Sequence, residues 1–301
     1  MTDFPQPALL PIAHLAPLQV DGRDAAAFLQ GQITCDVRCA DGNRSLPGAI
    51  CNPEGRVLAN FRLLARDNSF LLLLAADLIT AMQHHLRRYV LRADVNLTTA
   101  PLACLGVQGE PEALPAAAPR EADTVAQIGD LTWVRIPDPQ PRWLLIGDPA
   151  ALSRWQRQHE SPLASPQSWI LADICCGIPW ITAATSGRFL PQMLNLDLLG
   201  GICFDKGCYT GQEVIARVHY RGQVKRRLYR FFAPGAEPPP PGTAVMEEEE
   251  NVGEVVNAAP VAEGTELLAV VRRDVAHSSA LRLATAPSSR LQRRDLAYTV
   301  T

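Results

Sequence analysis

Apolar and polar positions alternate at strand or helix spacing along the first hundred residues, between clear turn signals. The turn Asn52-Pro53-Glu54-Gly55 separates two apolar segments, a pattern typical of a hairpin. The predicted elements are an extended segment over 1–20, helices over 24–32 and 77–88, and strands over 48–51, 56–64, 70–74 and 90–99. This mixture of strands and helices indicates an α+β fold and not a doubly wound parallel sheet.

Beyond residue 100 the same spacing continues as far as a composition change near 222–225. The predicted elements there are strands over 129–136 and 142–146 and helices over 148–159 and 168–177. After the change, short apolar segments recur at turn-like intervals, which predicts a small β-barrel with the acidic run 247–250 at a solvated hairpin tip. The expected domains are therefore 1–223 and 224–301.

One stretch concentrates the candidate chemistry: Lys206-Gly207-Cys208-Tyr209-Thr210-Gly211-Gln212-Glu213. Thr210 and Glu213 have the spacing of a capping box, which predicts a helix that starts at Thr210 and ends at Gly222. Cys208 would then lie just outside a helix N-terminus and two residues from the Lys206 cation, and both features stabilise a thiolate. The alternative is a tight turn that contains a buried, unreactive cysteine.

Composition excludes several classes of protein. In 301 residues, 47% are hydrophobic and 20% charged, as in an ordinary globular protein. The net charge of −3 gives no global attraction to nucleic-acid phosphates. Eight cysteines are too sparse for a disulfide scaffold, no basic signal segment begins the chain, and the most apolar run, 70–82, is too short to cross a bilayer. We expect a reduced, soluble, cytoplasmic protein.

Other chemistries find little support. No phosphate-binding glycine loop is present, and the Cys35/Cys39 pair has no second pair at metal-ligand spacing, so no metal site is predicted. A Cys208–His219 catalytic pair would need contact across two helical turns. A basic cluster could face an anionic ligand, RNA or only solvent. Its members are Arg217, Arg221, Lys225, Arg226, Arg227 and Arg230.

The eight-residue stretch resembles the signature of the YgfZ-type folate-binding proteins, relatives of the glycine-cleavage T-protein (aminomethyltransferase). Three other blocks, 30–37, 51–56 and 185–192, resemble further motifs of that family. The resemblance implies interleaved α+β subdomains, the second roughly 47–103, with a C-terminal barrel and tetrahydrofolate in a central channel. It also implies a role in iron–sulfur cluster assembly or repair, on which some tRNA modifications depend.

By position, the resemblance implies that Gln192 faces the pterin and that Cys208 is the functional thiol with Lys206 beside it. The other residues it places at the folate are Trp169, Asn195, Tyr209 and Gly207. The expected partners are folate and iron–sulfur assembly proteins or client enzymes. Neither a membrane nor direct nucleic-acid binding is expected.

One departure from the T-protein bears on the reaction class. Ala59 and Asn60 stand in the hairpin where that enzyme has acids, and an amide cannot serve as general base. Glycine-cleavage activity is therefore not expected. The alternative, a folate-dependent aminomethyl or one-carbon transferase, would need a carboxylate there. Leu15 also stands where the family has a tryptophan.

Overall fold

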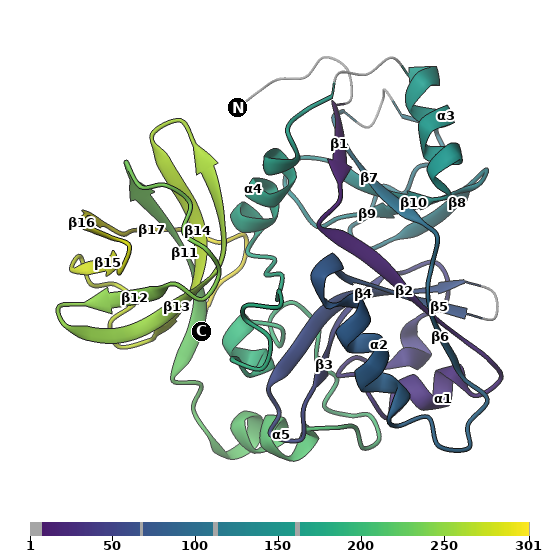
Figure 1. Cartoon of the computed structure of the whole chain (residues 1–301), viewed down its shortest axis with the longest axis horizontal. Helices are drawn as coiled ribbons and strands as arrows, with labels where there is room; N and C mark the ends of the chain where they lie inside the picture. Colours follow the sequence, from purple (N-terminus) through teal and green to yellow (C-terminus); the bar gives the residue numbers. More distant parts are fainter. Residues whose placement is uncertain (1–7, 67–68, 111–113, 160–162, 301) are drawn as a thin grey trace. The chain divides into compact units, whose positions relative to one another are not determined.

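The computed structural model describes residues 8–66, 69–110, 114–159 and 163–300 (Figure 1). The chain forms two compact units that interleave along the sequence. The first comprises Met1–Gln30, Asp36–Pro47 and Phe61–Trp169, and the second comprises Gly31–Cys35, Gly48–Asn60 and Ile170–Thr301. The prediction of an extended N-terminal segment lies, for residues 1–7, outside the described residues.

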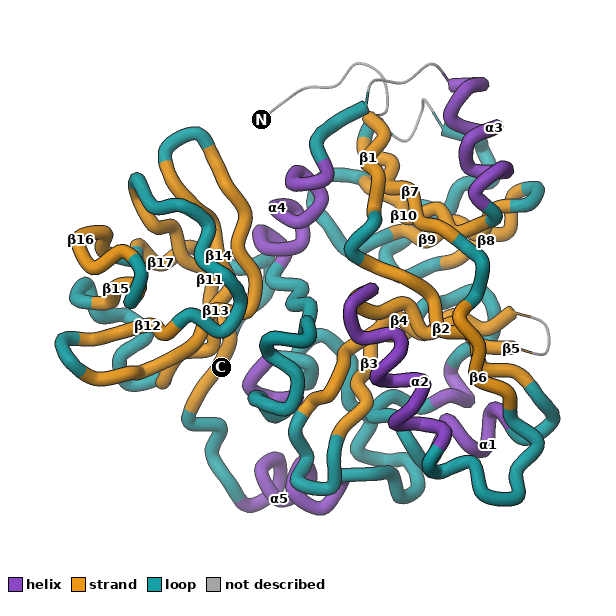
Figure 2. Tube along the Cα trace, viewed as in Figure 1, coloured by secondary structure: helices purple, strands orange, loops and turns teal. Residues whose placement is uncertain are grey.

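An antiparallel sheet in the first unit has the strand order β1-β7-β10-β9-β8 (Figure 2). Its strands are β1 (Ala8–Ile12), β7 (Ala103–Gln108), β8 (Val125–Ile128), β9 (Leu131–Arg135) and β10 (Arg142–Gly147). Helix α3 (Pro149–His159) packs on it, because Leu152 and Trp155 join Trp133 and Trp143 in one apolar core. The rings of Trp133 and Trp155 meet edge to face, 5.3 Å apart.

A second sheet has the order β3-β4-β5-β2-β6, and the chain passes from the second unit to the first within β4. Its strands are β2 (Leu15–Asp21), β3 (Leu46–Cys51), β4 (Val57–Arg66), β5 (Ser69–Ala75) and β6 (Asn96–Thr99). The helices in this part are α1 (Ala25–Gln30) and α2 (Ile79–Arg87), with 3₁₀ turns at Val37–Cys39 and Ala76–Leu78. The predicted hairpin is confirmed, with Gly55 at φ +74° in its turn.

The second unit contains α4 (Pro166–Cys176) from Ile170 on, a 3₁₀ turn at Pro191–Leu194, α5 (Gln212–Arg221) and a seven-stranded antiparallel sheet. The sheet curls into half a barrel, with the order β16-β15-β12-β13-β14-β11-β17. Its strands are β11 (Arg226–Pro234), β12 (Ala244–Glu247), β13 (Glu250–Val261), β14 (Gly264–Arg272), β15 (Leu281–Leu283), β16 (Ala286–Arg290) and β17 (Gln292–Arg294). The predicted acidic hairpin tip is confirmed between β12 and β13.

Most predicted elements are confirmed, and one strand is largely wrong. Of the strand predicted over 90–99, only β6 pairs with a neighbour. The N–H groups of Tyr89 and Val90 donate to the carbonyls of Leu86 and Arg87, so the chain continues turning at the end of α2. Apolar character alone had indicated a strand there, and local hydrogen bonding overrides it.

Candidate functional site

The signature loop that precedes α5 is anchored by its lysine. Lys206 is 6% exposed, and its Nζ donates to the carbonyls of Ile33 (2.9 Å) and Cys35 (2.7 Å). The ammonium also lies 5.2 Å from the ring centroid of Tyr209. The lysine therefore fixes the loop to the 31–35 segment of the same unit.

Cys208 and Gly207 are both exposed on this loop. Cys39 is the other exposed cysteine, whereas Cys51 and Cys104 are buried, and burial raises the pKa of both thiols. Thiolate character and exposure together govern cysteine reactivity. The Cys208 sulfur thus lies where a reactant can reach it, and the thiol role of Cys208, with Lys206 as its neighbour, stays a prediction.

The capping box predicted at the start of the helix is wrong. The N-cap of α5 is Gly211, at φ +83°, and no side chain caps the helix. Thr210 instead donates its N–H to the Gly31 carbonyl (3.2 Å) and its hydroxyl to Gln32 Oε1 (3.4 Å). The Thr210 side chain, which the local pattern assigns to the helix cap, therefore hydrogen-bonds to the 31–35 segment instead. The predicted helix end is confirmed, since Gly222 is the C-cap.

Gly211 is required by a close backbone approach. A Cβ at this position would lie 2.6 Å from the Asn52 carbonyl oxygen and 2.9 Å from the Gly55 Cα. The hairpin turn and the start of α5 are thus in direct backbone contact. A Cβ at Gly207 would meet no atom within 4 Å, so no close contact of that residue with the described residues requires a glycine.

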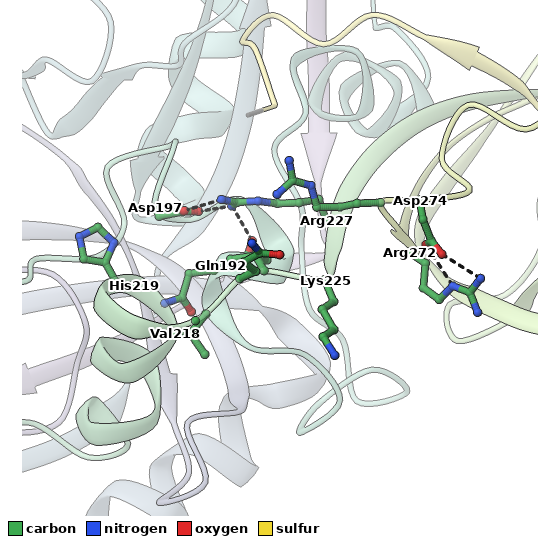
Figure 3. Close-up of a pocket in the computed structure, with 12 residues that line it drawn as sticks. Gln192, Asp197, Val218, His219, Lys225, Arg227, Arg272 and Asp274 are labelled. Carbon is green, nitrogen blue, oxygen red and sulfur yellow. Dashed lines mark hydrogen bonds and ion pairs between the residues drawn. The ribbon is translucent and has the colours of Figure 1, made fainter.

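A pocket of about 820 Å³ lies in the second unit, between the end of α5 and the adjoining ends of β11 and β14 (Figure 3). Gln192 lines it and is 1% exposed. Its Nε2 donates to the Ile215 carbonyl at 2.8 Å, and since only the NH₂ group can donate, this bond fixes the amide orientation. Gln192 Oε1 is left buried, with no hydrogen-bond donor among the described residues.

Arg227 stands beside Gln192 on the same pocket (Figure 3). Its guanidinium makes a bidentate ion pair with Asp197, in which Nη1 donates to Oδ1 at 2.6 Å and Nη2 donates to Oδ2 at 2.9 Å. Nη1 also donates to the Gln192 backbone carbonyl at 2.8 Å. Its buried Nε has no acceptor in the described part of the chain. Gln192 and Arg227 therefore each keep one polar atom buried beside the pocket without a partner among the described residues, an acceptor on Gln192 and a donor on Arg227.

The remaining predicted folate residues are buried. Asn195, at φ +58°, donates to the Leu228 carbonyl (2.9 Å) and to the Tyr298 hydroxyl (3.3 Å). Burial raises the pKa of Tyr209, and the neighbouring Cys51 adds to the shift. Trp169, the last residue of the first unit, packs against Gly106 and has the Arg142 guanidinium 4.5 Å from its ring. Their contact with folate stays a prediction.

Asn60 is held by the backbone of the second unit. Its Nδ2 donates to the Pro179 carbonyl (2.7 Å), and its Oδ1 accepts from the Ile181 N–H (2.8 Å). Both amide atoms therefore have structural partners. Ala59 beside it is fully buried and carries no polar group.

Two members of the basic cluster form ion pairs with carboxylates. Arg227 pairs with Asp197, and Arg230 pairs with Glu266 at 2.8 Å. His219 stacks on Phe204, with ring centroids 3.8 Å apart. Asp197 and Arg273 line the pocket but are not singled out by any sequence pattern. Asp197 is held there by its ion pair with Arg227, and Arg273 by the pairing of β14 with β11, and both contacts are tertiary. The described residues contain no group of three or more His, Cys, Asp or Glu that could hold a metal ion.

The fold defines a class of protein. The aminomethyltransferase T of the glycine cleavage system from Bartonella henselae superposes with a TM-score of 0.77 over 97% of this chain and 86% of that chain, at 14% identity. The chain thus has the glycine-cleavage T-protein fold, as predicted. At this identity the likeness concerns the fold alone.

Sequence relatives narrow the assignment. A protein of Edwardsiella ictaluri named tRNA-modifying protein YgfZ is 34% identical, with 94% of this chain and 89% of the relative covered. The protein of that name from Sodalis glossinidius is 30% identical, with 99% and 98% covered. The chain belongs to the YgfZ family, as the signature stretch predicted. No family model matches the chain.

The helices formed by residues 8–66, 69–110, 114–159 and 163–300 include none that is long and apolar enough to cross a membrane.

Proposed function

We propose that this chain binds tetrahydrofolate through the Gln192 pocket and serves as a cytoplasmic accessory protein for iron–sulfur cluster assembly or repair. Through its client enzymes it would support tRNA modification, the activity that its relatives' name states. Its partners would be folate and iron–sulfur assembly proteins or clients. No membrane or direct nucleic-acid contact is part of the proposal.

The unpaired Oε1 of Gln192 carries the folate part of the proposal. A pterin edge presents N–H donors beside a ring carbonyl, so it can donate to this oxygen and accept from the unpaired Nε of Arg227. The pocket, about 820 Å³, falls in the size range of small-molecule sites. When bound, tetrahydrofolate supplies N5 of its reduced pterin and the neighbouring N10, which can carry one-carbon units.

Asn60 argues against the transferase alternative. Its side-chain amide cannot accept a proton as a general base does. Both of its polar atoms are also hydrogen-bonded to the backbone, at Pro179 and Ile181. We therefore expect this chain to bind a folate without transferring its one-carbon unit, and the reactive group offered to a partner is the exposed Cys208 thiol.

Substituting Gln192 with leucine tests the folate part. This change removes the acceptor together with the Nε2 donor to the Ile215 carbonyl, and we expect tetrahydrofolate affinity to fall about tenfold or more, as for loss of one buried hydrogen bond to the ligand. Isothermal titration calorimetry measures it, with thermal melts to check folding. Gln223→Leu, an exposed glutamine on the same pocket, is the matched control with little expected effect. Equal affinities in wild type and Gln192→Leu would contradict the assignment.

Cys208→Ala tests the thiol. The side chain is exposed, so we expect the variant to fold and to bind tetrahydrofolate like wild type, yet to fail to restore iron–sulfur enzyme activity in a strain that lacks the gene. Cys39→Ala, which removes the other exposed thiol, should restore it fully. Full rescue by Cys208→Ala would refute the thiol role while leaving folate binding intact.

A further inference from the structure

An exposed aromatic side chain lies near the C-terminal end of α5. Tyr220 is 65% exposed, and no other large apolar side chain in the described part of the second unit is as exposed. Its ring meets that of His219 edge to face at 4.7 Å and that of Phe204 at 6.2 Å, while His219 and Phe204 stack on each other. An aromatic ring fixed in this way loses little conformational entropy when a partner covers it.

Two arginines lie on the same face of α5 as this tyrosine. Arg217 and Arg221 are both exposed and stand one helical turn apart. Neither guanidinium pairs with a carboxylate within the ranges that the structure describes. Like charges at this spacing destabilise a helix, and residues 214–236 contain no acid that could offset them. The face is therefore complementary to a surface that carries carboxylates.

The signature loop runs along the same helix. Phe204, near the start of the loop, stacks on His219 at the end of α5, whereas Cys208 lies three residues before Gly211, the N-cap. The aromatic cluster and the exposed thiol are thus at opposite ends of a ten-residue helix, which is about 15 Å long. A single protein interface of ordinary size spans that distance.

We propose that Arg217, Tyr220 and Arg221 form a docking surface for an acidic protein that approaches the Cys208 thiol. The proposal rests on the proposed function and specifies its partner: an iron–sulfur assembly protein or client enzyme whose contact face places Asp and Glu carboxylates around an apolar centre. Tyrosine and arginine are among the residues that contribute most binding energy at protein interfaces. A central aromatic ring flanked by unpaired guanidinium groups has this composition.

RNA fits the same surface less well. Proteins that bind single-stranded nucleic acid stack successive bases on free aromatic faces. Here one face of the His219 ring is already covered by Phe204, which leaves Tyr220 as the one strongly exposed ring of the cluster. The net charge of −3 also gives no general attraction to phosphates.

Two variants of the full chain test the surface, Tyr220→Ala and Arg217→Glu/Arg221→Glu. None of these side chains lines the Gln192 pocket, so tetrahydrofolate affinity, the thermal melt and the rate of Cys208 alkylation by iodoacetamide should match wild type. In the strain that lacks the gene, the iron–sulfur enzyme activity that each variant restores should fall about tenfold or more at equal protein level, as for loss of an interface hot spot.

Matched controls come from exposed positions of the first unit. Leu91→Ala truncates a side chain that is 86% exposed, and Arg157→Glu reverses the charge of an exposed arginine on α3. Both should restore the enzyme activity fully. Failure of these controls to do so would show that rescue responds to any surface change and would overturn the proposal.

A photo-crosslinker identifies the occupant. With p-benzoylphenylalanine in place of Tyr220, the full chain in cells should form adducts with iron–sulfur assembly proteins or client enzymes of acidic surface, identified by mass spectrometry. Arg217→Glu/Arg221→Glu should abolish these adducts. A nuclease-sensitive adduct would assign the surface to RNA, and an adduct of two copies of the chain would assign it to self-association; either result overturns the proposal.

The outcomes also separate this proposal from the proposed function. Full rescue by Tyr220→Ala and by Arg217→Glu/Arg221→Glu, with no rescue by Cys208→Ala, refutes the docking surface alone. Full rescue by all of these variants, Cys208→Ala included, refutes the thiol role as well.

Discussion

Gly211→Ala is expected to lower the free energy of unfolding by about 3 kcal/mol, through left-handed backbone strain and a backbone clash. The residue sits at φ +83°, and an added Cβ would press on the Asn52 carbonyl and the Gly55 Cα, which are backbone atoms with little room to move. The hairpin turn and the first turn of α5 would have to separate. Urea denaturation followed by circular dichroism measures the loss.

Gly207→Ala is the matched control four residues earlier. A Cβ there meets nothing within 4 Å, so the stability should change by no more than about 0.5 kcal/mol. Equal losses in the two variants would show that close packing at Gly211 is not what requires the glycine.

Arg227→Met is expected to cost about 3 kcal/mol, because it leaves the Asp197 carboxylate largely buried without its partner. The two side chains are 7% and 14% exposed, and the substitution also removes the donor to the Gln192 carbonyl. Arg226→Ala on the same strand should change stability little, since no ion pair within the described residues involves it.

A double substitution distinguishes the reason for this loss. Arg227→Met/Asp197→Leu removes both charges, so it should recover part of the stability if the unpaired carboxylate is the main cost. A double variant that is less stable than the sum of the two single losses would instead assign the cost to lost packing. The readout is again the urea midpoint.

Local pattern was enough for most elements of this fold. The hairpin turn at Asn52–Gly55, helices α2 and α3 and the strands of the C-terminal sheet each carry their own signal of spacing and turn residues. The segment 90–95 could not be predicted in this way, because its apolar residues follow the turn that ends α2. The backbone hydrogen bonds that decide its conformation cannot be read from its apolar spacing.

The site is harder to predict, because its geometry depends on pairings between distant segments. Thr210 has the spacing of a cap, yet its side chain bonds to Gln32, 178 positions away. The proximity of Lys225 to Arg273 follows from the register of β11 on β14. The signature stretch located the loop and the family; the partners of Lys206 and Gln192 required the structure.

The interleaving of the two units has a consequence for biosynthesis. Residues Gly31–Cys35 and Gly48–Asn60 belong to the unit that also holds Ile170–Thr301, so no single cut of the chain separates the units. During translation these early segments leave the ribosome long before Lys206, whose ammonium anchors the loop to the Ile33 and Cys35 carbonyls. A nascent chain that stops short of the signature loop therefore holds an incomplete second unit, and fragments ended before residue 206 lack the contacts that close it.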